Sequence, residues 1–186
     1  MGPFDCLAGL AISCAATIAA PPAPAPTYVV KPSEVAIPDG EKLGDYRRII
    51  HPFKNWTLIC DESQKSKHRV CNVTQTVVDQ QGNAAFSWSL AATADGKPLM
   101  MMRIPAAAGV GQTIELAMGN RPDRIRVQTD RCDPFFCHAV IAVGDMLKRH
   151  IRTGTPCTVT YAVPPAATVT LQAPLEGLFA ALAEAK

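Results

Sequence analysis

The 186-residue sequence lacks the motifs of the common catalytic centres. It has no nucleophile elbow, no close pair of carboxylates among pocket-like residues and no glycine-rich phosphate loop. The stretch Gly109-Val110-Gly111 lacks the remaining glycine and the following helix of such a motif, so it predicts a plain loop. The histidines are scattered without the spacing of metal ligands, and they are His51, His68, His138 and His150. We therefore expect no enzyme, no metal site and no cofactor.

An excess of charge of one sign is also lacking. Eighteen basic and 16 acidic residues leave a formal net charge of +2. This bias is too weak to indicate a nucleic-acid partner. Basic residues also do not alternate with aromatic ones, as they do in proteins that bind single-stranded nucleic acid. We expect no nucleic acid among the partners.

No apolar run in the sequence is long enough to span a membrane. The apolar stretch from Leu7 to Ala20 is 14 residues long, whereas a transmembrane helix needs about 20. Small residues follow it, so residues 1–20 predict a signal peptide cleaved near Ala20. The residues ending at Cys14 approximate a lipoprotein box, and a lipid at Cys14 is the alternative. We expect a periplasmic, outer-membrane-associated or secreted protein.

Seven cysteines are many for a reduced cytosolic protein of this size and favour an oxidising compartment. Four of them form two local pairs, Cys60 with Cys71 and Cys132 with Cys137. Closing these loops would stabilise the fold by about 3 and about 2 kcal/mol. We therefore predict two structural disulfides. Cys157 is left as a buried thiol, an intermolecular bridge or the partner of another cysteine.

The remaining pattern predicts a β-sandwich. Residues 21–52 predict a Pro/Ala-rich tether and an irregular arm, and residues 53–186 predict a single antiparallel β domain. Phe86 and Trp88, for example, alternate with Ser87, as they would on the two faces of a strand. The predicted strands cover residues 56–60, 70–78, 85–92, 99–104, 113–118, 124–129, 136–143, 157–163 and 167–171.

Two short helices interrupt the strand pattern. The first is predicted to begin with Asp145 as its N-cap, to carry Leu147, His150 and Ile151 on one face, and to end before Gly154. The second is predicted from Pro174 to Ala185, where apolar residues recur at helical spacing.

Several segments together resemble the invasion-associated locus B family of bacterial exported proteins. The segments are Trp56-Thr57-Leu58-Ile59-Cys60, Cys71-Asn72-Val73-Thr74-Gln75, Arg103-Ile104-Pro105 with Gly109-Val110, Cys132-Asp133-Pro134-Phe135-Phe136-Cys137-His138-Ala139 and Leu175-Glu176-Gly177-Leu178. The resemblance covers residues 53 to 182. It implies an immunoglobulin-like β-sandwich that is exported and, in some pathogens, linked to entry into host cells. It supplies no catalytic residues, and Cys157 is an extra cysteine relative to its pattern.

We expect an exported, non-enzymatic interaction protein with an envelope or host protein, or an anionic surface, as partner. The predicted interaction surface consists of Arg121, Arg124, Arg126, Arg131, Phe135 and Phe136. The alternative is a periplasmic thiol-redox or copper-handling protein that uses Cys132, Cys137, Cys157 and the methionines. Successive strand residues point to opposite faces, so Met100, Met101 and Met102 do not all reach one copper ion. This disfavours the alternative.

Overall fold

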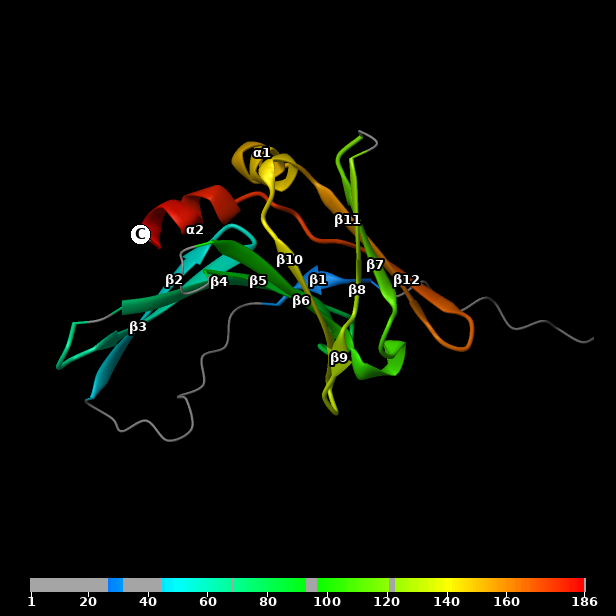
Figure 1. The fold of residues 1–186 in the computed structure, drawn as a ribbon, viewed down its shortest axis with the longest axis horizontal. Helices are drawn as coiled ribbons and strands as arrows, with labels where there is room; N and C mark the ends of the chain where they lie inside the picture. Colours follow the sequence, from blue (N-terminus) through cyan, green and yellow to red (C-terminus); the bar gives the residue numbers. More distant parts are fainter. Residues whose placement is uncertain (1–26, 32–44, 68, 93–96, 121–122, 186) are drawn as a thin grey trace, which may run out of the picture.

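The computed structural model describes five segments, residues 27–31, 45–67, 69–92, 97–120 and 123–185. The predicted signal peptide, Cys14 and Arg121 lie outside them. Within these segments most residues form antiparallel strands, arranged in two sheets with two short helices at one end (Figure 1). The predicted β-sandwich is therefore confirmed.

The larger sheet has eight strands in the order β2-β3-β4-β5-β6-β10-β9, and β1 pairs with β4. Neighbours that follow one another in sequence form hairpins, whereas β10 joins β6 from further along the chain. The strands are β1 Val29–Val30, β2 Tyr46–Phe53, β3 Trp56–Ser63, β4 Arg69–Val78, β5 Ala84–Ala92, β6 Pro98–Pro105, β9 Arg131–Cys132 and β10 Phe136–Ala142.

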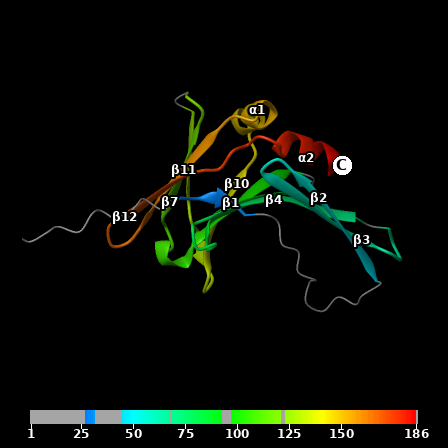
Figure 2. The same cartoon turned by 180° about the vertical axis from the view of Figure 1, so that it is seen from behind.

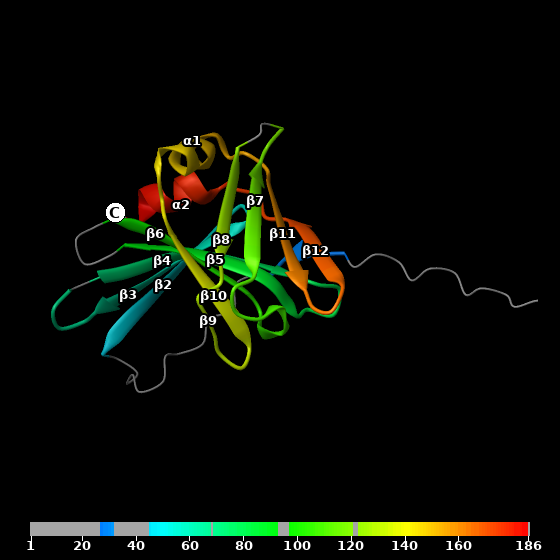
Figure 3. The ribbon, with the colours of Figure 1, turned by 45° about the vertical axis from the view of Figure 1, so that its right-hand side comes forward.

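The smaller sheet has four strands in the order β12-β11-β7-β8 and stands across one end of the larger sheet (Figure 3). Its strands are β7 Thr113–Met118, β8 Arg124–Gln128, β11 Cys157–Val163 and β12 Ala167–Gln172. Alternate residues of both sheets point inward and are buried. The larger buried side chains are Trp56, Leu58, Phe86, Trp88, Met100, Met102 and Ile104 from the larger sheet, and Ile114, Leu116, Met118, Val159 and Tyr161 from the smaller one.

Residues 46–52 were predicted to be irregular, and this prediction is wrong. They belong to β2, which pairs with β3 along its whole length, from Tyr46 opposite Ser63 to Phe53 opposite Trp56. The sequence hides this strand because it is an edge strand: Ile49 and Ile50 face opposite sides, and Pro52 is tolerated where no partner strand needs its N–H. An ion pair between Arg48 and Asp61, with Nε and Oδ1 2.6 Å apart, also joins β2 to β3.

The two helices and a short 3-10 helix (η1, Ala106–Ala108) complete the fold. Helix α1, Asp145–Thr153, follows β10, and helix α2, Leu178–Glu184, ends the described chain; both lie at the same end of the molecule (Figure 2). The predicted buried face of α1 is present at Leu147, His150 and Ile151.

Two details of the helix predictions are wrong. The N-cap of α1 is Gly144, which has extended dihedral angles, so Asp145 is the first helical residue and does not cap the helix through its side chain. Helix α2 begins at Leu178 rather than at Pro174, because Gly177 has φ 94° and ends the extended approach from β12.

A buried polar cluster connects the larger sheet to the segment before α2. The side-chain amide of Gln75 donates to the carbonyl oxygens of Asn55 (2.9 Å) and Pro174 (3.0 Å), and its oxygen accepts from Trp88 Nε1 (3.0 Å). Trp56 Nε1 also donates to the Pro174 oxygen, at 3.1 Å. The two indole rings stack with centroids 5.4 Å apart. Both rings are therefore fixed by packing and by hydrogen bonds.

The indole N–H of Trp56 is predicted to contribute to the free energy of unfolding in addition to the contribution of its ring. Trp56→Ala should lower the free energy of unfolding by about 3–5 kcal/mol, because it removes a buried aromatic side chain. Trp56→Phe keeps a ring but removes one of the two donors to the Pro174 carbonyl, which still accepts from Gln75, so it should cost about 0.5–1.5 kcal/mol. Urea unfolding measures both. A Trp56→Phe variant as stable as the parent would show that the hydrogen bond contributes nothing.

Gly177 should tolerate no side chain. A Cβ there would overlap the carbonyl oxygen of Lys54, whereas a Cβ at Gly109, which also has positive φ (86°), would meet nothing within 4 Å. Both alanine variants carry backbone strain of about 1–3 kcal/mol, and Gly177→Ala adds a steric cost of about 1–3 kcal/mol. Thermal unfolding of the pair checks this, and equal losses would contradict the close approach of α2 to the β2–β3 turn.

Candidate binding groove

An open groove lies between the two helices and one end of the larger sheet. Its volume is about 1110 Å³. Strands β4 and β6 begin at this end, β5 ends there, and β10 leads from it into α1. The groove thus has three walls: the ends of these strands, helix α1 and helix α2.

The strand ends and α2 make the apolar part of the groove. Val73 and Leu90, which are opposite each other in β4 and β5, are buried and form part of the floor. Helix α2 contributes Phe179, Leu182 and Ala183, whose spacing puts them on one face of the helix. The floor is therefore continuous with the hydrophobic core.

Two apolar side chains at this groove are exposed although they are large. Val70 is 62% exposed and Phe179 is 53% exposed. Exposed apolar side chains scattered singly are ordinary, but these two border the same apolar groove. Together they extend the apolar surface of the groove toward solvent.

Helix α1 makes the charged part. Asp145, Lys148, Arg149 and Arg152 recur at helical spacing and line the groove. Arg69, at the start of β4, is the fifth charged residue of the lining. Four cations and one carboxylate give this lining a formal net charge of +3.

Among the described residues, Lys148 is the only cation of this lining that lies within ion-pair distance of a carboxylate. Lys148 Nζ lies 3.4 Å from Asp145 Oδ1. Arg149 and Arg152 have no carboxylate within ion-pair distance in the described segments, and Arg69 Nη2 lies 3.1 Å from Cys60 Sγ. The arginines on α1 are therefore available to an anionic ligand.

Contacts at its C-terminal end hold α1 in place. The buried ring of His150 lies between two oxygens, with Nε2 2.9 Å from Asp123 Oδ2 and Nδ1 3.1 Å from Thr155 Oγ1. Gly154, with φ 62°, ends the helix in the left-handed conformation. The charged wall is thus anchored to the β7–β8 turn and to the segment before β11.

The first predicted disulfide lies directly beside the groove. Cys60 and Cys71 are opposite each other in β3 and β4 and are bonded, and Cys71 contributes to the groove lining. The bond fixes the start of β4, where Arg69 and Val70 border the groove. This pairing agrees with the sequence-based prediction.

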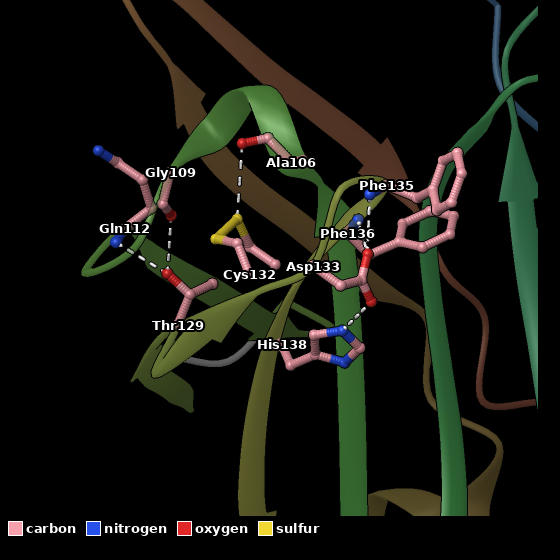
Figure 4. Close-up of a disulfide and its surroundings, with 10 residues drawn as sticks. Ala106, Gly109, Gln112, Thr129, Cys132, Asp133, Phe135, Phe136 and His138 are labelled. Atoms are coloured by element: carbon pink, nitrogen blue, oxygen red, sulfur yellow. Dashed lines mark hydrogen bonds and ion pairs between the residues drawn. A yellow bond between two sulfur atoms is a disulfide. The ribbon is translucent and has the colours of Figure 1, made fainter.

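The second predicted disulfide closes the β9–β10 hairpin, away from the groove (Figure 4). Asp133, between Cys132 and Cys137, accepts from His138 Nε2 at 2.7 Å and from the backbone N–H groups of Phe135 and Phe136 at 2.8 Å. These bonds, that with His138 foremost, lower the pKa of Asp133 to about 2. The hairpin is a tightly closed structural turn.

The predicted surface of arginines and phenylalanines does not form a single site with the cations of α1. Arg124 and Arg126, on the edge strand β8, both pair with Glu115, so β7 neutralises part of their charge. Arg131 is exposed, and at the hairpin tip Phe135 is 74% exposed whereas Phe136 is partly buried. Arg121 lies outside the described residues.

Cys157 is buried within the sandwich, whereas the three consecutive methionines of β6 point alternately to its two faces. Cys157 is fully buried, opposite Met118, and forms no disulfide within the described chain. Burial raises the pKa of its thiol to about 12. Met100 and Met102 are buried in the core, whereas Met101 points to the other face of β6 and is partly exposed.

The sequence did not reveal the groove. Its cations on α1 are not part of the predicted interaction surface, and no spacing in the sequence connects them with Arg69, Phe179 and Leu182. The available signal was the amphipathic pattern of α2, in which Phe179 falls outside the face formed by the buried Leu178 and Ala181. Such a pattern shows that an apolar side chain faces away from the core, but not what lies beside it.

The described segments contain neither a membrane-spanning helix nor a cluster of metal ligands. No helix in them is long and apolar enough to cross a bilayer. No three His, Cys, Asp or Glu side chains in them gather as ligands of a metal ion.

Comparison with known proteins identifies the family of this chain. A family model described as invasion associated locus B (IalB) protein matches residues 56–186, and a search of curated proteins found no match. The crystal structure of invasion associated protein B from Bartonella henselae has a similar fold, with a TM-score of 0.62, 18% identity, and coverage of 73% of this chain and 94% of that chain. At this identity the likeness concerns the fold alone.

The family match begins at Trp56, the first residue of β3. It therefore includes both disulfides, both helices and every residue that lines the groove, whereas β1 and β2 precede it. Since the match covers more than half of the sequence, the chain belongs to the invasion-associated locus B family.

Proposed function

We propose that this chain is an exported, non-enzymatic binding protein of the bacterial envelope and that the groove between α1, α2 and the larger sheet is its binding site. The observation that carries the proposal is the groove itself, in which exposed apolar side chains meet arginines that have no carboxylate partner among the described residues. Export is supported by family membership and by two closed disulfides, which persist in an oxidising compartment.

The groove supports binding better than the hairpin and β8 surface does. Phe135 is exposed on a hairpin tip, and Arg124 and Arg126 share Glu115. A concave apolar surface with convergent charges buries much more of a ligand than a protruding tip does. We therefore assign the partner, an envelope or host molecule, to the groove.

The redox and copper alternative has less support. A thiol needs its thiolate form to exchange or to bind metal, and the pKa of Cys157 is raised to about 12 by burial. Cys137 is also fully buried. A redox role would require these sulfurs to become accessible.

The Cys157 thiol is predicted to be unreactive in the folded protein. With a pKa of about 12, its thiolate fraction at about pH 8 is roughly one in ten thousand. Iodoacetamide labelling followed by peptide mass mapping should detect modification of Cys157 only after denaturation. Rapid labelling of Cys157 in the native protein would favour the redox alternative.

Photo-cross-linking in the bacterium that encodes the chain tests the proposed site. A benzoylphenylalanine replacing Phe179 should form an adduct in intact envelopes, because this position borders the groove. The same replacement of Phe135, the more exposed of the two, is the matched control and should give little or none. Gel mobility and intact mass report protein-sized and small adducts, respectively. An adduct at position 135 alone would contradict the assignment of the groove.

A further inference from the structure

The groove keeps its charged and apolar side chains apart. Helix α1 contributes four charged side chains to the lining, whereas α2 and the strand ends contribute mainly apolar groups. The four are Asp145, Lys148, Arg149 and Arg152. A ligand that fits both parts has an anionic group at one end or side and a long apolar remainder. This arrangement selects for an amphiphile.

The lining is also poor in uncharged hydrogen-bonding side chains. Among the described residues that line the groove, none is Ser, Thr, Asn, Gln, His, Tyr or Trp, so every polar side chain is charged. Sugars, nucleotides and extended peptides carry hydroxyl or amide groups that lose water when they are buried and then need hydrogen-bond partners. An acyl chain has no such groups. The lining therefore favours a hydrocarbon chain over these ligands.

Arginine suits the anionic end. A guanidinium group binds a carboxylate through two parallel hydrogen bonds and is more weakly hydrated than an ammonium group. Arg149 and Arg152 have no carboxylate within ion-pair distance in the described part of the chain. A ligand carboxylate bound beside α1 would give both arginines an anionic partner.

We infer that the groove binds a fatty acid, with its hydrocarbon chain along Val70, Leu182 and Ala183, which are at least partly exposed, and its carboxylate at Arg149 and Arg152. The inference rests on the proposed binding function and names the class of ligand. Phe179, at the border of the apolar part, covers the bound chain.

Isothermal titration of the disulfide-intact full chain with dodecanoate, below its critical micelle concentration, tests this inference. Saturable one-to-one binding is expected. Decanoate, two methylenes shorter, should bind about tenfold more weakly, since each buried methylene contributes a fixed increment. Dodecyltrimethylammonium has the same chain length but a cationic head group, so it should bind at least tenfold more weakly than dodecanoate.

Two matched pairs of variants locate the site. The double variant Arg149→Glu/Arg152→Glu should weaken dodecanoate binding at least about fivefold, whereas Arg124→Glu/Arg126→Glu, with the same change in net charge on β8, should change it less than twofold. Phe179→Glu should weaken binding more than Phe135→Glu does. All six substituted residues are exposed, and thermal unfolding verifies that each variant folds.

The outcomes separate the inference from the proposed function. Absence of saturable binding, equal binding of the cationic amphiphile, or equal losses in both arginine pairs would overturn the fatty-acid assignment. If binding is absent but position 179 gives a protein-sized adduct that Arg149→Glu/Arg152→Glu abolishes, the groove binds a protein segment and only the ligand class is wrong. If position 179 also gives no adduct, both the ligand class and the binding site are wrong.

Discussion

The hydrogen bonds of the Gln75 side chain are the constraint on which the arrangement of the groove depends. This buried amide joins β4 to the β2–β3 turn, to Trp88 and to the carbonyl oxygen of Pro174. Leaving one of these buried groups unpaired would cost about 1–3 kcal/mol. Few other geometries would satisfy all of them. Because Pro174 lies just before α2, the same bonds place that helix against the end of the larger sheet.

The groove results from this placement together with the way the strands end. Trp56 also binds the Pro174 oxygen, and the close approach of Gly177 to Lys54 brings the start of α2 against the β2–β3 turn. The other wall, α1, is held by His150 between Asp123 and Thr155. The helices therefore do not close over the strand ends, and apolar side chains such as Phe179 are left at the surface. The disulfide between Cys60 and Cys71 fixes the third wall.

Charge is available for binding only where the fold leaves it unpaired. Arg124 and Arg126 look like the stronger cationic pair in the sequence because they alternate on one strand face. The strand register places Glu115 of β7 opposite Arg126, and Glu115 forms ion pairs with both arginines. Arg149 and Arg152 belong to a helix wall that faces apolar side chains instead. This is the physical reason for assigning the binding site to the groove rather than to the predicted arginine surface.

The sequence by itself determined the fold class, the two local disulfides, most strands and the family. Each of these depends on spacing over a few residues, such as the alternation of Phe86 and Trp88 or the closeness of Cys132 to Cys137. Strand β2 was missed because an edge strand has a weak pattern. The groove was missed because its walls come from residues as far apart as Arg69, Arg149 and Phe179. Only tertiary structure decides which side chains meet across such distances, since packing and strand register, rather than local spacing, bring them together.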